Sequence, residues 1–350
     1  MIRSTPLRPT TRRRPVAVAA VLVLAVGLAA CSSSTSGGAQ SAAKGTPLRK
    51  LRVMLDWTPN TNHSGMYLAR AKGWYRAAGL DVSFLQPGDS SSLELLAAGR
   101  ADVAVSVAEE VIPARAHGLP VQSIAAIIQH NTSSLVSLAS TGIHRPRDLA
   151  GKTYGSYGGP IEEPLVKKLV ACDGGDPNSV KFVQVGNSDY RIGLQRHQFD
   201  TVWIFDGWDG IRLNKIDKVA TNEIAFADQT KCIPDWYTPL LATSTKVEQA
   251  RPADLKAFVA ATARGYREAM AHPGEATDAL MAAAPDLDRT LVSQSAEYLA
   301  TRYAAHPDAW GIQSAAVWAR FAQFLTDAKI VPGPVDLGAV WTNRFLPPTG

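Results

Sequence analysis

Cysteine is scarce in this chain, and the cysteines present are not spaced as metal ligands. Cys31, Cys172 and Cys232 are the three among 350 residues. They form neither a Cys-x-x-Cys pair nor a Cys/His cluster of the kind that holds zinc, so the sequence predicts no metal site. In an oxidising compartment Cys172 and Cys232 can form a disulfide. Two buried free thiols are the alternative, and the sequence leaves both open.

An excess of positive charge is also lacking once the N-terminus is set aside. Five of the 36 Lys and Arg residues lie within residues 1–30. The rest of the chain has 31 basic and 31 acidic residues, so its formal charge is zero. No basic stripe or nucleic-acid-binding motif follows. We therefore expect no nucleic acid partner.

Signatures of common enzyme classes are missing as well. The sequence contains no nucleophile elbow, no phosphate-binding P-loop and no dinucleotide fingerprint. We therefore predict no catalytic residues. About 300 residues beyond the N-terminus are enough to bury a large core, and chains of that size usually form two lobes.

No apolar run in the sequence is long enough to span a bilayer comfortably. Val16–Ala30 is 15 residues long and follows a basic start, which predicts a secretory signal over residues 1–30. Its end, Leu28–Cys31, resembles a bacterial lipobox, which implies cleavage before Cys31 and a lipid on its sulfur. An ordinary signal peptide with an incidental cysteine is the alternative. Residues 31–48 then predict a flexible tether that holds an exported domain at the membrane.

Strand-like and helix-like patterns alternate through the first half of the chain. Leu51, Val53 and Leu55 recur with the period of a strand, and a polar turn and a helix follow them. This alternation predicts parallel sheets with covered faces. The chain leaves one α/β lobe (49–140), builds a second (141–237) and returns (238–350). We therefore expect a cleft between two α/β lobes, where a small ligand binds.

Three segments at predicted strand ends carry aromatic and acidic side chains: Leu55–Gly65 (LDWTPNTNHSG), Tyr154–Glu163 (YGSYGGPIEE) and Trp203–Ile211 (WIFDGWDGI). In this order they closely resemble the binding proteins for thiamine-pyrimidine precursors and the related riboflavin-binding proteins. The resemblance covers Leu51–Phe345. It implies a type 2 periplasmic binding protein fold, a small flat heterocyclic ligand and an ABC permease as partner.

The residues of these segments suit a flat ring with an amino group. Aromatic side chains stack on ring faces, and carboxylates accept hydrogen bonds from an amino edge. Asparagine amides can both donate and accept. The candidate ligand-binding residues are Asp56, Trp57, Asn60, His63, Tyr157, Glu162, Glu163, Trp203, Asp206 and Trp208.

Each of these residues also has a structural interpretation. Trp57 and Trp203 follow or lie within apolar strands and could belong to the core. Asn60 could simply build the turn, and His63 could fill a loop. The two adjacent glutamates fall in the first turn of a predicted helix, where carboxylates favour the helix dipole. The backbone N–H groups of residues 158–161 could instead hold an anion.

From these patterns we expect an exported, lipid-anchored substrate-binding protein of an ABC importer. It would act as a monomer without a cofactor and carry a thiamine pyrimidine precursor into thiamine biosynthesis or salvage. Riboflavin and an alkanesulfonate are the alternative ligands, because stacking alone does not distinguish flat rings.

The resemblance extends to the fungal thiamine pyrimidine synthases, which use pyridoxal phosphate and iron and consume a histidine of their own. His63 falls where that family places its histidine. The fungal enzymes also carry a segment with four cysteines, whereas this chain has only Cys172 and Cys232 beyond the signal. We therefore expect a binding protein, with synthase activity as the second hypothesis.

Overall fold

The computed structural model describes residues 47–348, apart from residues 89 and 187–188. The predicted signal peptide, the predicted lipidation site at Cys31 and most of the predicted tether lie outside the described residues. Within the described part, no helix is both long enough and apolar enough to cross a membrane.

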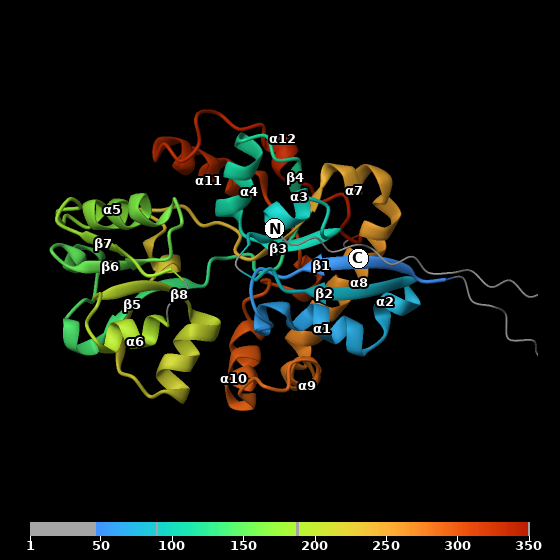
Figure 1. Cartoon of the computed structure of the whole chain (residues 1–350), viewed down its shortest axis with the longest axis horizontal. Coiled ribbons are helices and arrows are strands. Elements are labelled where there is room, and N and C mark those ends of the chain that lie inside the picture. The colour runs from blue at the N-terminus through green and yellow to red at the C-terminus, as the bar shows by residue number, and fades with distance from the viewer. Residues whose placement is uncertain (1–46, 89, 187–188, 349–350) are drawn as a thin grey trace, which may run out of the picture. The chain divides into compact units, whose positions relative to one another are not determined.

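The first lobe contains a five-stranded sheet with the strand order β2-β1-β3-β10-β4 (Figure 1). Strand β1 runs parallel to β2 and β3, whereas β10 runs antiparallel to β3 and β4. The sheet is therefore mixed: β1, β2 and β3 are parallel, as the alternation predicted, and β10, which returns from the second lobe, adds the antiparallel pairings. The strands are β1 (Arg49–Met54), β2 (Leu80–Leu85), β3 (Val103–Ser106), β4 (Val121–Ala126) and β10 (Leu240–Ser244).

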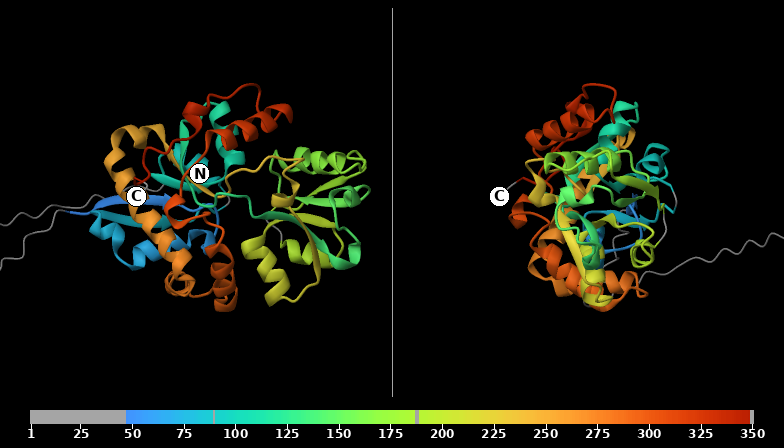
Figure 2. Two further views of the ribbon diagram at one scale, coloured as in Figure 1. Left: turned by 180° about the vertical axis from the view of Figure 1, so that it is seen from behind. Right: turned by 90° about the vertical axis from the view of Figure 1, so that its left-hand side faces the viewer.

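Helices from both ends of the chain cover this sheet, as the blue and the orange-to-red segments show in Figure 2. They bury Leu51, Val53 and Leu55, the residues whose alternation predicted the first strand. The helices are α1 (Ser64–Ala71), α2 (Trp74–Ala77), α3 (Ser92–Ala97), α4 (Ala108–Ala116), α7 (Thr245–Ala250), α8 (Pro252–Ala271), α9 (Pro273–Ala283), α10 (Arg289–Ala300), α11 (Ala315–Asp327) and α12 (Leu337–Val340), with 3-10 turns at Thr61–His63 and Pro307–Ala309.

The second lobe contains another five-stranded sheet, with the order β7-β6-β8-β5-β9. Strand β5 (Ser133–Leu138) runs antiparallel to its two neighbours, and β6 runs parallel to β7 and β8. The remaining elements are β6 (Thr153–Ser156), β7 (Lys181–Gln184), β8 (Thr201–Phe205), β9 (Thr221–Ala225), α5 (Glu162–Cys172), α6 (Tyr190–Gln195), 3-10 turns at Ala139–Thr141, Pro146–Leu149 and Phe226–Gln229, and two π-helical segments, Asp206–Gly210 and Arg212–Ile216.

The position of strand β5 shows that the boundary between the lobes lies earlier in the chain than the sequence predicted. The sequence placed that boundary after residue 140, but Ser133–Leu138 already pairs with β8 and β9 of the second sheet. Ser133, Ser134 and Ser137 of this strand are all buried. The first lobe therefore ends before residue 133.

A disulfide joins Cys172 to Cys232 within the second lobe, with their Cα atoms 5.8 Å apart. Cys172 is the last residue of α5, and Cys232 lies in the segment that leads from β9 back to the first sheet. The bridge therefore fastens this return segment to the helix that covers the second sheet. The sequence left open whether Cys172 and Cys232 form a disulfide or remain free thiols, and the structure contains the disulfide.

Two glycines allow α1 to cross α8 at close range. A methyl group on Gly265 would overlap the carbonyl oxygen of Gly65, and one on Gly65 would overlap the ring of Tyr266. These helices therefore approach each other backbone to backbone. Because α1 begins at Ser64, directly after His63, this crossing also fixes the position of the first candidate segment.

We predict that Gly265→Ala destabilises the fold by about 1–3 kcal/mol, because the added methyl group has no space and α8 must shift away from α1. Gly274→Ala is the matched control, since nothing lies within 4 Å of the position that its methyl group would take. Urea unfolding of both variants measures the effect. Equal stabilities for the two variants would contradict the close helix crossing.

Candidate functional site

The first candidate segment is organised by a buried histidine. His63 is fully buried, and its Nδ1 accepts a hydrogen bond from the backbone N–H of Asn60 at 3.2 Å. The ring proton therefore lies on Nε2, which donates to Asp56 Oδ1 at 2.7 Å. The hydrogen-bond network thus fixes the tautomer of His63, and the ring holds the Asp56 carboxylate in place at the end of β1.

Asn60 builds the turn rather than lining a cavity. Its side-chain oxygen accepts from the backbone N–H of Asn62 at 2.9 Å, and its side-chain nitrogen donates to the Thr58 carbonyl at 3.0 Å. Asn60 is also buried. The prediction that Asn60 and His63 contact a ligand is therefore not supported, because the polar atoms of both side chains are engaged within the segment.

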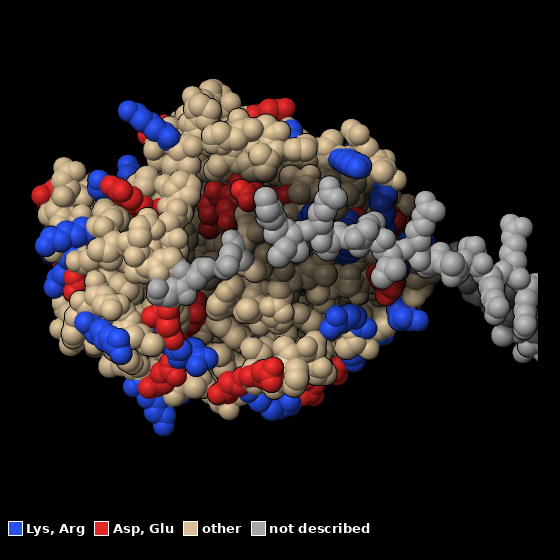
Figure 3. Space-filling view, in the orientation of Figure 1, with Lys and Arg blue, Asp and Glu red and all other residues tan. Residues whose placement is uncertain are grey.

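Asp56 and Trp57 line a cavity of about 250 Å³ in the first lobe. We call it the first-lobe cavity. It lies where β1, β2 and β3 end, and the Trp57 side chain is 55% exposed. Acidic side chains also lie at the back of a hollow on the face of the molecule shown in Figure 3. The other lining residues are Gly88, Ser90, Ser91, Ser92, Ser106, Val107 and Glu110.

Glu110 is a lining residue that the sequence reasoning missed. It lies in the first turn of α4, directly after β3, and Ser106 Oγ donates to its Oε2 at 3.1 Å. Glu110 is exposed to solvent, yet partial desolvation beside the cavity raises the pKa of its carboxyl, and the nearby charges of Asp56 and Glu94 raise it further. Its position after a buried strand could have revealed it, but acidic residues are common in first helical turns for reasons of helix stability alone.

In the second candidate segment, Glu162 has a structural role. Its Oε2 accepts from Tyr154 Oη at 2.7 Å and from the Tyr157 backbone N–H at 3.1 Å, and its Oε1 accepts from the Gly159 N–H at 2.7 Å. Glu162 is also buried. It therefore fixes the turn that precedes α5, so the structure gives Glu162 a structural role, and ligand contact by this residue remains a prediction.

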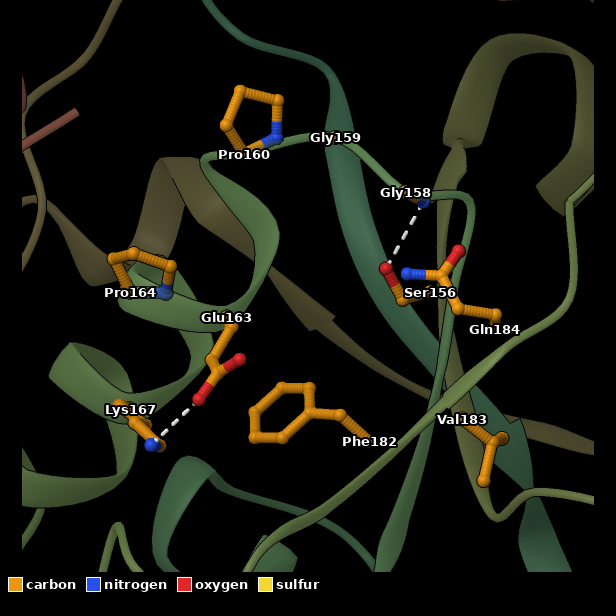
Figure 4. A pocket seen from close by; sticks show the side chains of 10 residues that line it. All are labelled: Ser156, Gly158, Gly159, Pro160, Glu163, Pro164, Lys167, Phe182, Val183 and Gln184. Carbon is orange, nitrogen blue, oxygen red and sulfur yellow. Dashed lines mark hydrogen bonds and ion pairs between the residues drawn. The ribbon is translucent and has the colours of Figure 1, made fainter. Parts of the chain in front are cut away.

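Glu163 has the opposite environment. Its side chain is 55% exposed and pairs with Lys167 at 2.7 Å, one helical turn further along α5. Both residues line a second cavity of about 450 Å³, the second-lobe cavity, together with Phe182 and Gln184 (Figure 4). Tyr157, which is 41% exposed, directly precedes Gly158 and Gly159, two of the other lining residues. Of the two adjacent glutamates, Glu163 is thus the accessible one.

Trp203 belongs to the core. It is 8% exposed, and its ring packs edge-on against Phe226 at 4.8 Å and Trp236 at 6.0 Å between centroids. Trp236 in turn stacks on Phe321 of α11 and donates to Glu109 Oε2 at 2.8 Å. The continuous apolar run of β8 thus places Trp203 on a buried face, where it packs as a core residue, and stacking on a ligand remains a prediction.

The third candidate segment joins the second lobe to the first. Trp208 packs partly buried against Tyr67 and Val292 of the first lobe. Ser295 of α10 is fully buried, donates to the Gly207 carbonyl and is hydrogen-bonded to Thr61 Oγ1. The first and third segments are thus linked through a single serine, and Trp208 serves this contact between the lobes.

Asp206 lies beside the same contact. Burial raises the pKa of its carboxyl to about 7, with a further contribution from Glu223, while Arg302 lowers it. Within the described residues its Oδ1 has no hydrogen-bond partner. A carboxylate in this setting binds a proton in the folded state that it would release in the unfolded chain.

The ten predicted residues therefore fall into separate groups. Asp56 and Trp57 meet Glu110 at the first-lobe cavity, and Tyr157 and Glu163 belong to the second-lobe region. Asp206 and Trp208 lie at the contact between the lobes. The remaining four, Asn60, His63, Glu162 and Trp203, support the fold around these places.

We predict that Glu162→Gln destabilises the protein by about 1.5–3 kcal/mol, because it removes a charged acceptor from three donors. Glu163→Gln is the matched control and should change the free energy of unfolding by less than about 0.5 kcal/mol, since its ion pair is exposed. Urea unfolding of both variants compares them. A larger loss for Glu163→Gln would contradict these assignments.

The pKa of Asp206 predicts a pH dependence of stability. Its value is about 7 in the folded state against 3.8 for a free side chain. The folded state therefore binds the additional proton, and the free energy of unfolding should fall as the pH rises from about 4 to about 7. Asp206→Asn should remove this part of the decrease, whereas Asp228→Asn, an exposed control in the same lobe, should not. Urea unfolding at a series of pH values between 4 and 8 measures this dependence. If the free energy of unfolding changed with pH in the same way for wild type and Asp206→Asn, the prediction would be contradicted.

Comparison with known proteins agrees with this architecture. The family described as NMT1/THI5 like matches residues 60–276. The formylaminopyrimidine-binding protein of Halalkalibacterium halodurans is 26% identical over 291 residues, which cover 80% of this chain and 82% of that protein. The 4-amino-5-hydroxymethyl-2-methylpyrimidine phosphate synthase of Legionella pneumophila is 26% identical over 303 residues, which cover 86% and 93%.

Among solved structures, the alkanesulfonate-binding protein SsuA from Xanthomonas axonopodis pv. citri shares the fold at 15% identity. Its TM-score is 0.66, over 85% of this chain and 99% of that protein. The predicted two-lobed α/β periplasmic binding protein fold is thereby confirmed. The resemblance carried by the three segments is confirmed as well: the chain belongs to the NMT1/THI5 like family.

Proposed function

We propose that this protein is the solute-binding component of an ABC importer and captures an aminopyrimidine precursor of thiamine. It is exported through the signal at residues 1–30, anchored by a lipid on Cys31 and tethered by residues 31–48. It works as a monomer, and its ligand-bound form delivers the pyrimidine to a permease. The ligand leaves the protein chemically unchanged.

The observation that carries this proposal is the lining of the first-lobe cavity. An exposed tryptophan stands beside the carboxylate of Asp56, which His63 holds in a fixed orientation. An aromatic face and a carboxylate edge are what a flat, amino-bearing ring requires. A formylaminopyrimidine-binding relative that aligns along most of both chains supports the same ligand class.

The alternative ligands fit this cavity less well. Its volume of about 250 Å³ lies below the range of about 300–1,000 Å³ that is usual for drug-sized ligands, which favours a single ring over the three fused rings of riboflavin. Its described lining includes two carboxylates, Asp56 and Glu110, and no Lys or Arg. Such a lining repels the sulfonate group of an alkanesulfonate.

The residues do not fit the cofactors of a pyrimidine synthase. Within the described part of the chain, no group of three or more His, Cys, Asp or Glu is placed to hold a metal ion. Lys167, the lysine that lines the second-lobe cavity, is paired with Glu163. His63, which would be the reactive residue, is buried with both ring nitrogens engaged. We therefore derive no catalytic step, although a synthase is among the relatives.

Trp57 provides the test of ligand and site together. We predict that the full-length protein binds a 4-amino-5-hydroxymethylpyrimidine in calorimetry, and that Trp57→Ala weakens binding at least about 10-fold through lost stacking and burial. Trp57→Phe, which keeps an aromatic face, should retain most of the affinity.

The competing ligands are titrated under the same conditions. Riboflavin and an alkanesulfonate should bind at least about 100-fold more weakly than the aminopyrimidine. Tighter binding of either one, or conversion of the aminopyrimidine during the titration, would overturn the proposed function.

A further inference from the structure

Two carboxylates of the first-lobe cavity are each held by one oxygen. His63 Nε2 donates to Asp56 Oδ1, and Ser106 Oγ donates to Glu110 Oε2. Among the described residues, Asp56 Oδ2 and Glu110 Oε1 have no hydrogen-bond donor. Both side chains line the same cavity, so both free oxygens are available to a ligand there. Asp56 comes from the end of β1, and Glu110 comes from the start of α4.

Among the described residues that line the cavity, none carries a positive charge that balances this pair. The other lining residues are the Trp57 ring, two small or apolar residues and four serines. The nearest support for Asp56 is the His63 ring, which is neutral in the tautomer that the hydrogen bonds require. The charge of Glu94 adds to that of Asp56 around Glu110. An incoming ligand must therefore supply the N–H donors or the positive charge itself.

We propose that Asp56 and Glu110 together form a charge-selecting subsite, which accepts the amino edge of an unphosphorylated aminopyrimidine and rejects its phosphate ester. This inference rests on the proposed function. The two free carboxylate oxygens receive N–H groups of the ring, and the Trp57 face covers it. A phosphate monoester carries between one and two negative charges at neutral pH, which the two carboxylates repel.

Glu110 is the specificity-determining member of the pair. Asp56 is hydrogen-bonded to His63, which belongs to the turn. Replacing Asp56 would therefore disturb the structure of the turn as well as remove a charge. Glu110 is held by a single serine hydroxyl, and Gln can accept that hydrogen bond through its side-chain oxygen. Glu110→Gln therefore removes the charge while it keeps the shape of the side chain.

The test compares a 4-amino-5-hydroxymethylpyrimidine with its phosphate monoester, in calorimetry on the full-length protein. Wild type should bind the alcohol at least about 100-fold more tightly than the ester. Glu110→Gln should weaken binding of the alcohol and strengthen binding of the ester. The ratio of the two affinities should therefore fall at least about 10-fold. Glu94→Gln is the matched control, because Glu94 adds charge nearby without lining the cavity. The ratio of alcohol affinity to ester affinity in Glu94→Gln should stay within about threefold of the wild-type ratio.

A second measurement requires no variant. In wild type the preference for the alcohol should shrink as sodium chloride is raised from 20 to 500 mM, because salt screens the repulsion of the ester. Equal affinities of wild type for the alcohol and the ester would contradict the proposed subsite. So would an ester-to-alcohol affinity ratio that is unchanged both in Glu110→Gln and at high salt. In either case the proposed function would still stand. Binding of riboflavin or an alkanesulfonate, with neither pyrimidine bound, would overturn both.

Discussion

The hydrogen bond from His63 to Asp56 is the interaction on which the rest of the site depends. It requires a neutral ring with its proton on Nε2, and the backbone N–H of Asn60 secures that tautomer from the other side. The close crossing of α1 with α8 at Gly65 fixes the helix that begins directly after His63, and Ser295 connects Thr61 of the same turn to the second lobe. A single buried ring therefore orients a carboxylate within a turn that also takes part in the contact between the lobes.

This arrangement bears on two functions that sequence similarity does not separate. A binding protein and a synthase are equally similar to this chain, and both align with most of its length. A histidine that reacts must be exposed to its partner, whereas a histidine that supports a carboxylate is best buried. His63 is fully buried with both ring nitrogens engaged, and this position supports the proposed binding function.

Much of the fold could be predicted from local patterns, because the alternation of Leu51, Val53 and Leu55 reports burial on one face of a strand. Strand β5 could not, since its serines are polar and their burial depends on neighbouring strands that lie far away in sequence. The same limit applies to the site. Glu162 and Glu163 are adjacent and chemically identical, yet one is enclosed by three donors and the other is exposed. Glu110 was missed because an acidic residue in a first helical turn is common for helix stability alone, and the structure then places it beside the same cavity as Asp56.

Nitrogen-15 NMR of the His63 ring in the full-length protein tests this arrangement most directly. With labelled histidine, His63 should be neutral near pH 7, with its proton on Nε2 and an unprotonated Nδ1 that accepts a hydrogen bond. The Nδ1 and Nε2 resonances of His63 should still report this protonation pattern when an aminopyrimidine is added, because the ring supports Asp56 and does not react. A proton on Nδ1, or loss of the His63 resonances on addition of the ligand, would contradict it.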